Sequence, residues 1–245
     1  MQKRSRSVVL IAVALVLVAL ATAAAILVFR HASPIAVSPV STLNTGGLVP
    51  GPAVMAPSKS IGEVAANRDI WLEISWKFFG ELRTLNAVTV GGVPARRLVR
   101  SNEVPASADS EIWVITAGSG DKLEKATSAD IGFAFDGGNP AITMQIYRVV
   151  GASEEPAAKV AEIGSSISIA IPADGVALIS LIASGTDSGS LSNVTKDFRA
   201  RCGKDFLGIH ASKSSTSAES VTATFSGGVA ANFAAVALQP ALEMR

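Results

Sequence analysis

From Glu63 to Gln239, apolar residues recur at every second position in short runs. The run DIWLEISWKFF places Ile70, Leu72 and Ile74 on one face and Trp71 and Glu73 on the other. A period of two is typical of a half-buried β-strand, because successive side chains of a strand point to opposite faces. These runs therefore predict strands and not helices.

The runs are separated by residues that favour turns. Gly91-Gly92 supplies the positive φ that a tight hairpin needs, and DGGN (136–139), PADG (172–175) and GTDSGS (185–190) mark further turns. Many short strands joined in this way predict an all-β fold, an antiparallel β-sandwich of the jelly-roll or immunoglobulin-like kind. We expect this domain to cover residues 63–240, followed by a short tail, 241–245.

An apolar run, VVLIAVALVLVALATAAAILVF, extends from Val8 to Phe29 after three basic residues, Lys3, Arg4 and Arg6. A helix needs about 20 apolar residues to span a bilayer, so residues 1–30 predict an N-terminal transmembrane or signal helix. One interpretation is an uncleaved signal-anchor that holds the protein in the membrane. Another is a signal peptide that is cleaved near Ala23 or Ala25 and releases a secreted protein. Both place the body outside the cytoplasm; a third interpretation is a buried core helix.

Residues 31–62 are poor in charge and rich in chain-breaking residues. No Lys, Arg, Asp or Glu occurs from His31 to Ser58, and five prolines interrupt the segment. Proline removes a backbone donor and favours extended conformations in its neighbours. The segment is therefore predicted to be a spacer between membrane and domain, although a segment packed along the domain as an irregular edge is the alternative.

Composition excludes some classes of partner and of chemistry. The chain has 21 Lys and Arg and 20 Asp and Glu, and four of the basic residues precede the body, which is therefore mildly acidic. A nucleic-acid partner is disfavoured, because such proteins present a basic stripe to phosphates. The single cysteine, Cys202, cannot form a disulfide within its own chain and is expected to be a small buried residue.

Motifs for catalysis or cofactor binding are lacking. The two histidines are His31, in the spacer, and His210, in FLGIHAS, which is expected to be a strand residue and not a base. The sequence contains no G-x-S-x-G, C-x-x-C or H-E-x-x-H. Asp136, Asn139 and Asp187 could ligate calcium, but turns need the same residue types. No catalytic residue, cofactor or metal is predicted.

Aromatic residues give the best candidates for a contact surface. Trp71 and Phe79 fall on the polar face of their strand, and Trp113 lies in SEIWVIT. Exposed rings could contact a protein partner or stack on a glycan. We therefore take Trp71, Phe79 and Trp113 as the candidate contact surface, and a homo-oligomer stays open as well.

Several strand and turn segments carry a resemblance to a known kind of module. VTVGGVPARRLV, SEIWVITA, IYRVVGA, VALISLIAS, SVTATFSGG and AAVALQP follow one another along the chain. Their order resembles a β-sandwich module of phage and prophage virion-associated proteins and of uncharacterised bacterial proteins, over Trp71 to Pro240. The resemblance implies a sandwich and no functional residue.

Together these features predict a non-enzymatic, exported β-sandwich. It would act in binding or assembly, either at the cell envelope, with Val8 to Phe29 in the membrane, or in a phage-derived particle. The alternative is a secreted protein that binds or modifies carbohydrate.

Overall fold

The computed structural model describes residues 34–241, apart from 105, 119–120 and 186–188. The predicted all-β, antiparallel, sandwich-like fold is confirmed, and residues 34–240 form one compact unit. The segment Val8–Phe29 lies outside the described residues, so its prediction as a helix stays a prediction. Within the described part of the chain, no helix is long and apolar enough to cross a bilayer.

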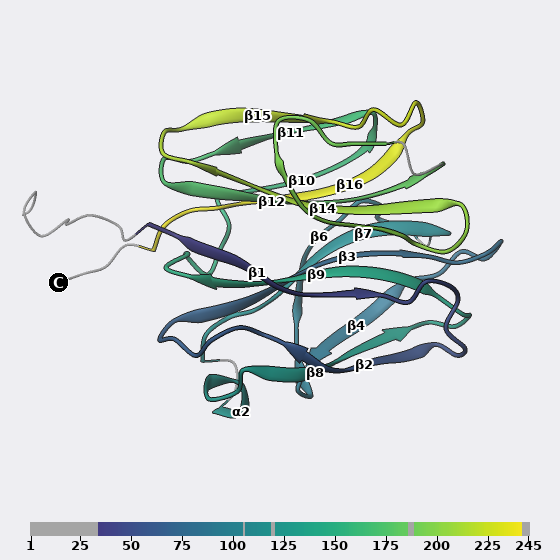
Figure 1. The fold of residues 1–245 in the computed structure, drawn as a ribbon, viewed down its shortest axis with the longest axis horizontal. Coiled ribbons are helices and arrows are strands. Elements are labelled where there is room, and N and C mark those ends of the chain that lie inside the picture. The colour runs from purple at the N-terminus through teal and green to yellow at the C-terminus, as the bar shows by residue number, and fades with distance from the viewer. Residues whose placement is uncertain (1–33, 105, 119–120, 186–188, 242–245) are drawn as a thin grey trace, which may run out of the picture. The chain divides into compact units, whose positions relative to one another are not determined.

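The strands form four sheets, which we number I to IV in the order in which they stack (Figure 1). Sheet I has the order β2 (Ala53–Ser60), β8 (Ser128–Phe135), β4 (Leu85–Val90) and β5 (Val93–Pro94). Sheet II has the order β1 (Ala36–Asn44), β9 (Ala141–Val150), β3 (Arg68–Lys77), β7 (Ala108–Ile115) and β6 (Arg96–Arg100).

Sheets III and IV come from the second half of the chain. Sheet III has the order β10 (Ala158–Gly164), β16 (Ala231–Leu238), β12 (Gly175–Ser184), β14 (Phe206–Ser215) and β13 (Thr195–Arg201). Sheet IV pairs β11 (Ser166–Ile171) with β15 (Glu219–Thr224). A single helical turn, α2 (Asp121–Glu124), precedes β8.

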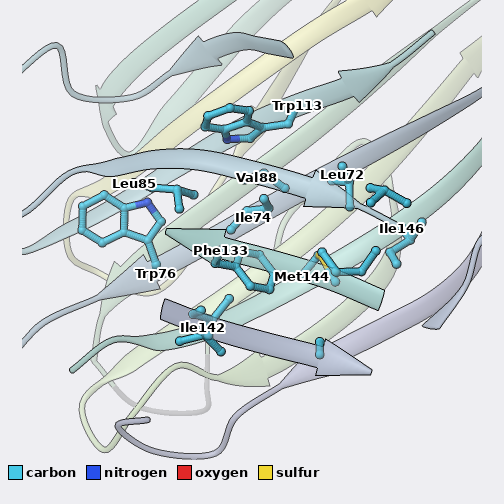
Figure 2. Packing of buried hydrophobic residues seen from close by; sticks show 14 of the residues in the cluster. Leu72, Ile74, Trp76, Leu85, Val88, Trp113, Phe133, Ile142, Met144 and Ile146 are labelled. Atoms are coloured by element: carbon cyan, nitrogen blue, oxygen red, sulfur yellow. The ribbon is translucent and has the colours of Figure 1, made fainter. Parts of the chain in front are cut away.

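Each neighbouring pair of sheets is joined by its own apolar layer. Sheets I and II enclose a core around Trp76 and Phe133, which Figure 2 shows together with Leu72, Ile74 and Met144. Sheets III and IV enclose a second core. A third cluster, which includes Trp71 and Leu178, joins sheet II to sheet III. Sheets II and III are therefore middle layers with both faces covered.

The covered faces explain the burial of the central strands. All ten residues of β3 are buried, and so are nine of the ten residues of β12. Polar residues of β3 that alternate with its apolar ones do not face water. They face the neighbouring sheet instead, where they need partners within the protein.

The two halves of the body share one strand order. Sheet II runs β1-β9-β3-β7-β6 and sheet III runs β10-β16-β12-β14-β13, so each strand of the first has its counterpart in the second. Likewise β2-β8 corresponds to β11-β15, and an isolated bridge between Leu191 and Phe225 stands where β4 pairs with β8. In these orders β1 corresponds to β10, and β6 corresponds to β13. The contacts between the halves are reciprocal in this sense, because β1 contacts β13 and β10 contacts β6.

The prediction of a spacer is wrong for much of residues 31–62, because β1 and β2 belong to the sandwich. Both are edge strands in their sheets. Pro39 and Pro57 lie where the register shifts, between Pro39 and Ser41 in β1 and between Ala56 and Lys59 in β2. Edges and bulges are the positions in a sheet that tolerate proline.

Candidate functional site

The predicted contact surface of Trp71, Phe79 and Trp113 is not formed. Trp71 is fully buried between sheets II and III, and Trp113 is buried in the core between sheets I and II. Phe79 alone is open to solvent, with 46% of its surface exposed. The prediction is therefore wrong for both tryptophans, which point to opposite faces of sheet II.

Polar side chains instead gather between sheets II and III, in a cluster that we call the interlayer network. Its members are Glu73, Ser75, Ser110, Thr143, Tyr147, Ser180, Asp197 and His210. Ser75 Oγ lies 3.0 Å from Ser110 Oγ, 3.2 Å from Ser180 Oγ and 3.0 Å from the carbonyl oxygen of Leu181. These hydroxyl groups join the two halves of the body.

His210 lies at the centre of the network and has partners on both ring nitrogens. Its Nδ1 lies 3.3 Å from Ser180 Oγ and 3.4 Å from Glu73 Oε2, and its Nε2 lies 3.3 Å from Thr143 Oγ1. The ring also stacks on Phe198. Burial lowers the pKa of His210 to about 3, so the imidazole is neutral at ordinary pH.

Glu73 is the acidic member of the network. Burial raises the pKa of Glu73 well above its ordinary value, and the nearby charge of Asp197 raises it further. The hydroxyl of Tyr147 lies 2.8 Å from Asp197 Oδ2 and 3.4 Å from Glu73 Oε2. Burial thus favours the neutral carboxylic acid form of Glu73, because a charged carboxylate in the interior is costly.

The set of Thr143, His210 and Glu73 contains the groups of a hydroxyl–imidazole–carboxyl relay. All three side chains have 0% of their surface exposed. A nucleophile and base can act only on a substrate that reaches them, within about 3 Å. In this conformation the network can therefore hold sheets II and III together, but a substrate in solvent cannot reach its side chains. The prediction of His210 as a strand residue is confirmed.

A second buried acid, Glu111, lies in the core between sheets I and II. It accepts hydrogen bonds from the indole Nε1 atoms of Trp76, at 3.1 Å, and Trp113, at 2.8 Å. Burial raises the pKa of Glu111 to about 7, the charge of Asp109 adds to the shift, and Arg97 opposes it. This carboxyl group satisfies two buried donors and so has a structural role.

The other candidate side chains that the structure describes, the cysteine and two of the calcium candidates, also have partners within the fold. Cys202 is buried, as predicted, and burial raises the pKa of its thiol to about 12. Asp136 Oδ1 accepts from the backbone N–H of Thr84, and Asn139 Oδ1 from that of Gly51. Asp187 lies outside the described residues. Within the part of the chain that the structure covers, no group of three or more His, Cys, Asp or Glu could hold a metal ion.

One hollow of about 550 Å³ lies at the start of β3. Its lining includes Val64, Arg68, Ile115 and Leu123. The guanidinium of Arg68 donates to the carbonyl oxygens of Gly62, Ala126 and Leu123. Since these bonds hold the loops that wall the hollow, Arg68 is engaged in structure and is not free to bind a ligand.

Sequence reasoning missed the interlayer network entirely. Its signal was present in the polar residues at alternating positions of β3, which a single two-sheet sandwich would place in solvent. No family model matches the chain, and a search of curated proteins finds no match.

Proposed function

We propose that the chain is a non-enzymatic, exported β-sandwich protein that acts in binding or assembly, at the cell envelope or in a phage-derived particle. The observation that carries the proposal is the sealing of the interlayer network. The groups best suited to acid–base or nucleophilic work are wholly buried, with His210 lying 3.3 Å from Thr143 and 3.4 Å from Glu73. The body presents to solvent the outer faces and edges of a stack of four sheets.

The strand order supports a finer assignment of the fold, which we also propose. Orders of β1-β9-β3-β7 in one sheet and β2-β8-β4-β5 in the other correspond to the two sheets of a jelly roll. The second half follows the same order with a shorter outer sheet. Jelly rolls occur in viral capsid and lectin domains, so the fold is compatible with assembly, although fold alone does not establish function.

The carbohydrate alternative depended on exposed aromatic rings that could stack on sugars. With Trp71 and Trp113 buried, Phe79 is the remaining ring of that set. Flat aromatic faces supply much of the apolar contact in a ligand site, and one half-exposed ring supplies little. The binding-or-assembly proposal is therefore the better supported of the two.

The proposal is tested on cells that produce the full chain and have been stripped of any outer wall. A membrane-impermeant amine reagent should label exposed lysines of the body, such as Lys125 and Lys159, without lysis. An impermeant cross-linker should also join the chain to a partner or to other copies. Labelling only after lysis would contradict export, and a turnover by purified protein that His210→Ala abolishes would contradict a non-enzymatic role.

A further inference from the structure

The outer face of β13, the edge strand of sheet III, carries positive charges. Residues that pair directly across two strands share a face. Phe198 pairs with His210, and its ring stacks on that of His210 in the layer toward sheet II. Arg199 pairs with Ile209, which belongs to the core between sheets III and IV. Arg199 therefore points away from sheet II, and Lys196, which pairs two residues further along β14, shares this outer face.

Two more cations extend this set into a row. Arg201 pairs with Leu207, a member of the same core, and Lys213 alternates with Ile209 on β14. Successive positions on one face of a strand lie about 7 Å apart. Sheet IV packs over the other side of sheet III, because β11 contacts β10, β16 and β12. All four side chains are at least partly open to solvent, and we call them the cationic row: Lys196, Arg199, Arg201 and Lys213.

The strand that corresponds to β13 in the first half, β6, also carries arginines, but these are neutralised within the fold. Each lies 2.6 to 3.6 Å from a carboxylate, in the pairs Arg96–Glu155, Arg97–Glu111 and Arg100–Asp109. Among the described residues, no ion pair involves Lys196, Arg199 or Lys213. Within that part of the chain, these three cations thus lack the carboxylates that hold the arginines of β6.

Arg199 also carries a hydrogen-bond donor that the fold leaves unsatisfied. Its Nη2 atom is shielded from solvent and has no hydrogen-bond partner among the described residues. Buried donors are nearly always satisfied, because a donor without an acceptor costs free energy. A guanidinium offers a planar fork of donors that matches the paired oxygens of an oxyanion. Since the side chain is partly exposed, a modest rotation would bring Nη2 to an oxyanion at the surface.

The shape of the cationic row favours a polymer over a single small anion. The cations follow one another in steps of about 7 Å, whereas one oxyanion group reaches hydrogen-bond partners at about 3 Å. Several oxyanion groups on one molecule are therefore needed to engage the row. β13 is also a sheet edge, and an edge presents backbone N–H and C=O groups that can bond to hydroxyl groups of a ligand.

Neighbouring side chains distinguish between classes of polyanion. Single-stranded nucleic acids are held by aromatic rings on which their bases stack, but Phe198 and Phe206, the rings of β13 and β14, alternate with the outer face and lie toward sheet II. Surfaces that dock on membranes add exposed apolar side chains to their cations. None of the large apolar side chains exposed in the described chain lies on β13 or β14. An anionic polysaccharide needs neither rings nor apolar anchors.

We propose that the cationic row binds an anionic polysaccharide, with oxyanion groups of the polymer on Lys196, Arg199 and Lys213 and sugar hydroxyl groups on the edge of β13. This role rests on the proposed binding function at the cell envelope and gives that function a class of ligand. Charge and not ring stacking holds the polymer, so the burial of Trp71 and Trp113 does not weaken the interaction. Composition concealed the row, because the net charge of +1 averages it with acidic residues elsewhere.

The test measures binding of the full chain, kept in solution by a nonionic detergent, to immobilised polysaccharides. Dextran sulfate and polygalacturonate supply sulfate and carboxylate groups, and neutral dextran is the uncharged control. Lys196→Gln with Arg199→Gln removes two adjacent charges of the row. Arg96→Gln with Lys159→Gln is the matched control, because it removes two charges that both pair with Glu155. Each affinity is measured at low and moderate ionic strength, since salt screens exposed charges.

We expect at least one anionic polysaccharide to bind and neutral dextran not to bind. The Lys196/Arg199 double variant should lose about tenfold or more in affinity, and the control double variant should change by less than about twofold. Lys196→Glu alone, at an exposed position, should also weaken binding, and the unfolding midpoint checks that each variant folds. The loss should shrink at the higher ionic strength.

Equal binding by the two double variants, or no binding to either anionic polysaccharide, would overturn the proposal. Tighter binding to DNA or to phosphatidylglycerol vesicles than to the polysaccharides would overturn it as well. Binding by purified protein does not depend on export. Failure of the amine labelling on intact cells would therefore contradict the proposed function and leave this site standing, whereas failure of the polysaccharide assay would leave the labelling result unchanged.

Discussion

Ser75 and Ser180 meet across the interface between sheets II and III, with their Oγ atoms 3.2 Å apart. Within its own sheet Ser75 is paired with Ser110 on β7, and Ser180 is paired with His210 on β14. Since β3 and β12 hold the same place in the two strand orders, the serines lie on corresponding strands of the two halves. The middle sheets of the two halves thus meet through corresponding strands.

The contributions of Ser75 and Ser180 to the free energy of unfolding should therefore be coupled. Ser75→Ala removes hydroxyl contacts to Ser110, Ser180 and Leu181 and should lower the free energy of unfolding by about 1–3 kcal/mol. Ser75→Ala with Ser180→Ala should cost less than the sum of the single changes by about 0.5–1.5 kcal/mol. Urea unfolding measures this cycle. Ser168→Ala, on the exposed face of β11, is the control, and full additivity would contradict the contact.

Sheets II and III approach each other closely at Gly208, so a larger residue at this position should destabilise the protein. A Cβ atom there would lie 2.1 Å from Thr143 Oγ1 and 3.1 Å from Thr143 Cβ. Gly208→Ala should lower the free energy of unfolding by about 1–3 kcal/mol, the usual cost of overpacking, and Thr143→Ala should restore part of it. Gly47→Ala is the matched control, because nothing lies within 4 Å of its Cβ. An unchanged unfolding midpoint for Gly208→Ala would disprove the close packing.

Glu111 should make the protein less stable as pH rises. Its pKa is raised from 4.5 to about 7, so the folded state binds this proton more tightly than the unfolded state. Stability from this group is present below about pH 4.5 and is lost between there and pH 7, by about 3 kcal/mol. Denaturant titrations at several pH values should show this slope in the native chain and not in Glu111→Gln. Parallel pH profiles for the two proteins would refute the assignment.

Lys77 links the two halves through aromatic rings. Its Nζ lies 4.0 Å from the ring centroid of Phe79 and 3.8 Å from that of Phe206. Cation–π contacts are worth about 0.5–2 kcal/mol. A cycle of Lys77→Met and Phe206→Leu should therefore give a coupling energy in that range, measured by urea unfolding. A coupling of zero would mean that the ammonium gains nothing from the ring.

The strands that sequence predicts best are those with strong apolar alternation. β3 and β7 were expected from DIWLEISWKFF and SEIWVIT, and both are found there. Alternation was read as one face in the core and one in water. That interpretation holds for a single sandwich and fails for a middle layer, so Trp71 was placed on the surface when it is buried between two sheets.

β1 and β2 could not be predicted from local pattern. They contain Pro39 and Pro57, carry few β-branched residues and lie at sheet edges, where half of the backbone groups need no partner strand. Only their pairing with β9 and β8, far along the chain, defines them. The alternating polar residues of β3 signal a covered second face, but the partners within the interlayer network could not be predicted, because Glu73, Thr143 and His210 meet only after sheets II and III have stacked.

The central claim is that His210 is sealed within the fold and does no chemistry with solvent. Its protonation can be followed by NMR of the imidazole in the full chain, with His31→Asn to assign the two histidine signals. Because its pKa is lowered from 6.5 to about 3, the unfolded state binds this proton more tightly, and the stability that His210 contributes is lost as pH falls. We predict that the ring stays neutral in the folded protein from pH 8 down to about pH 4. A titration near 6.5 would contradict the account, because it would place His210 in contact with water.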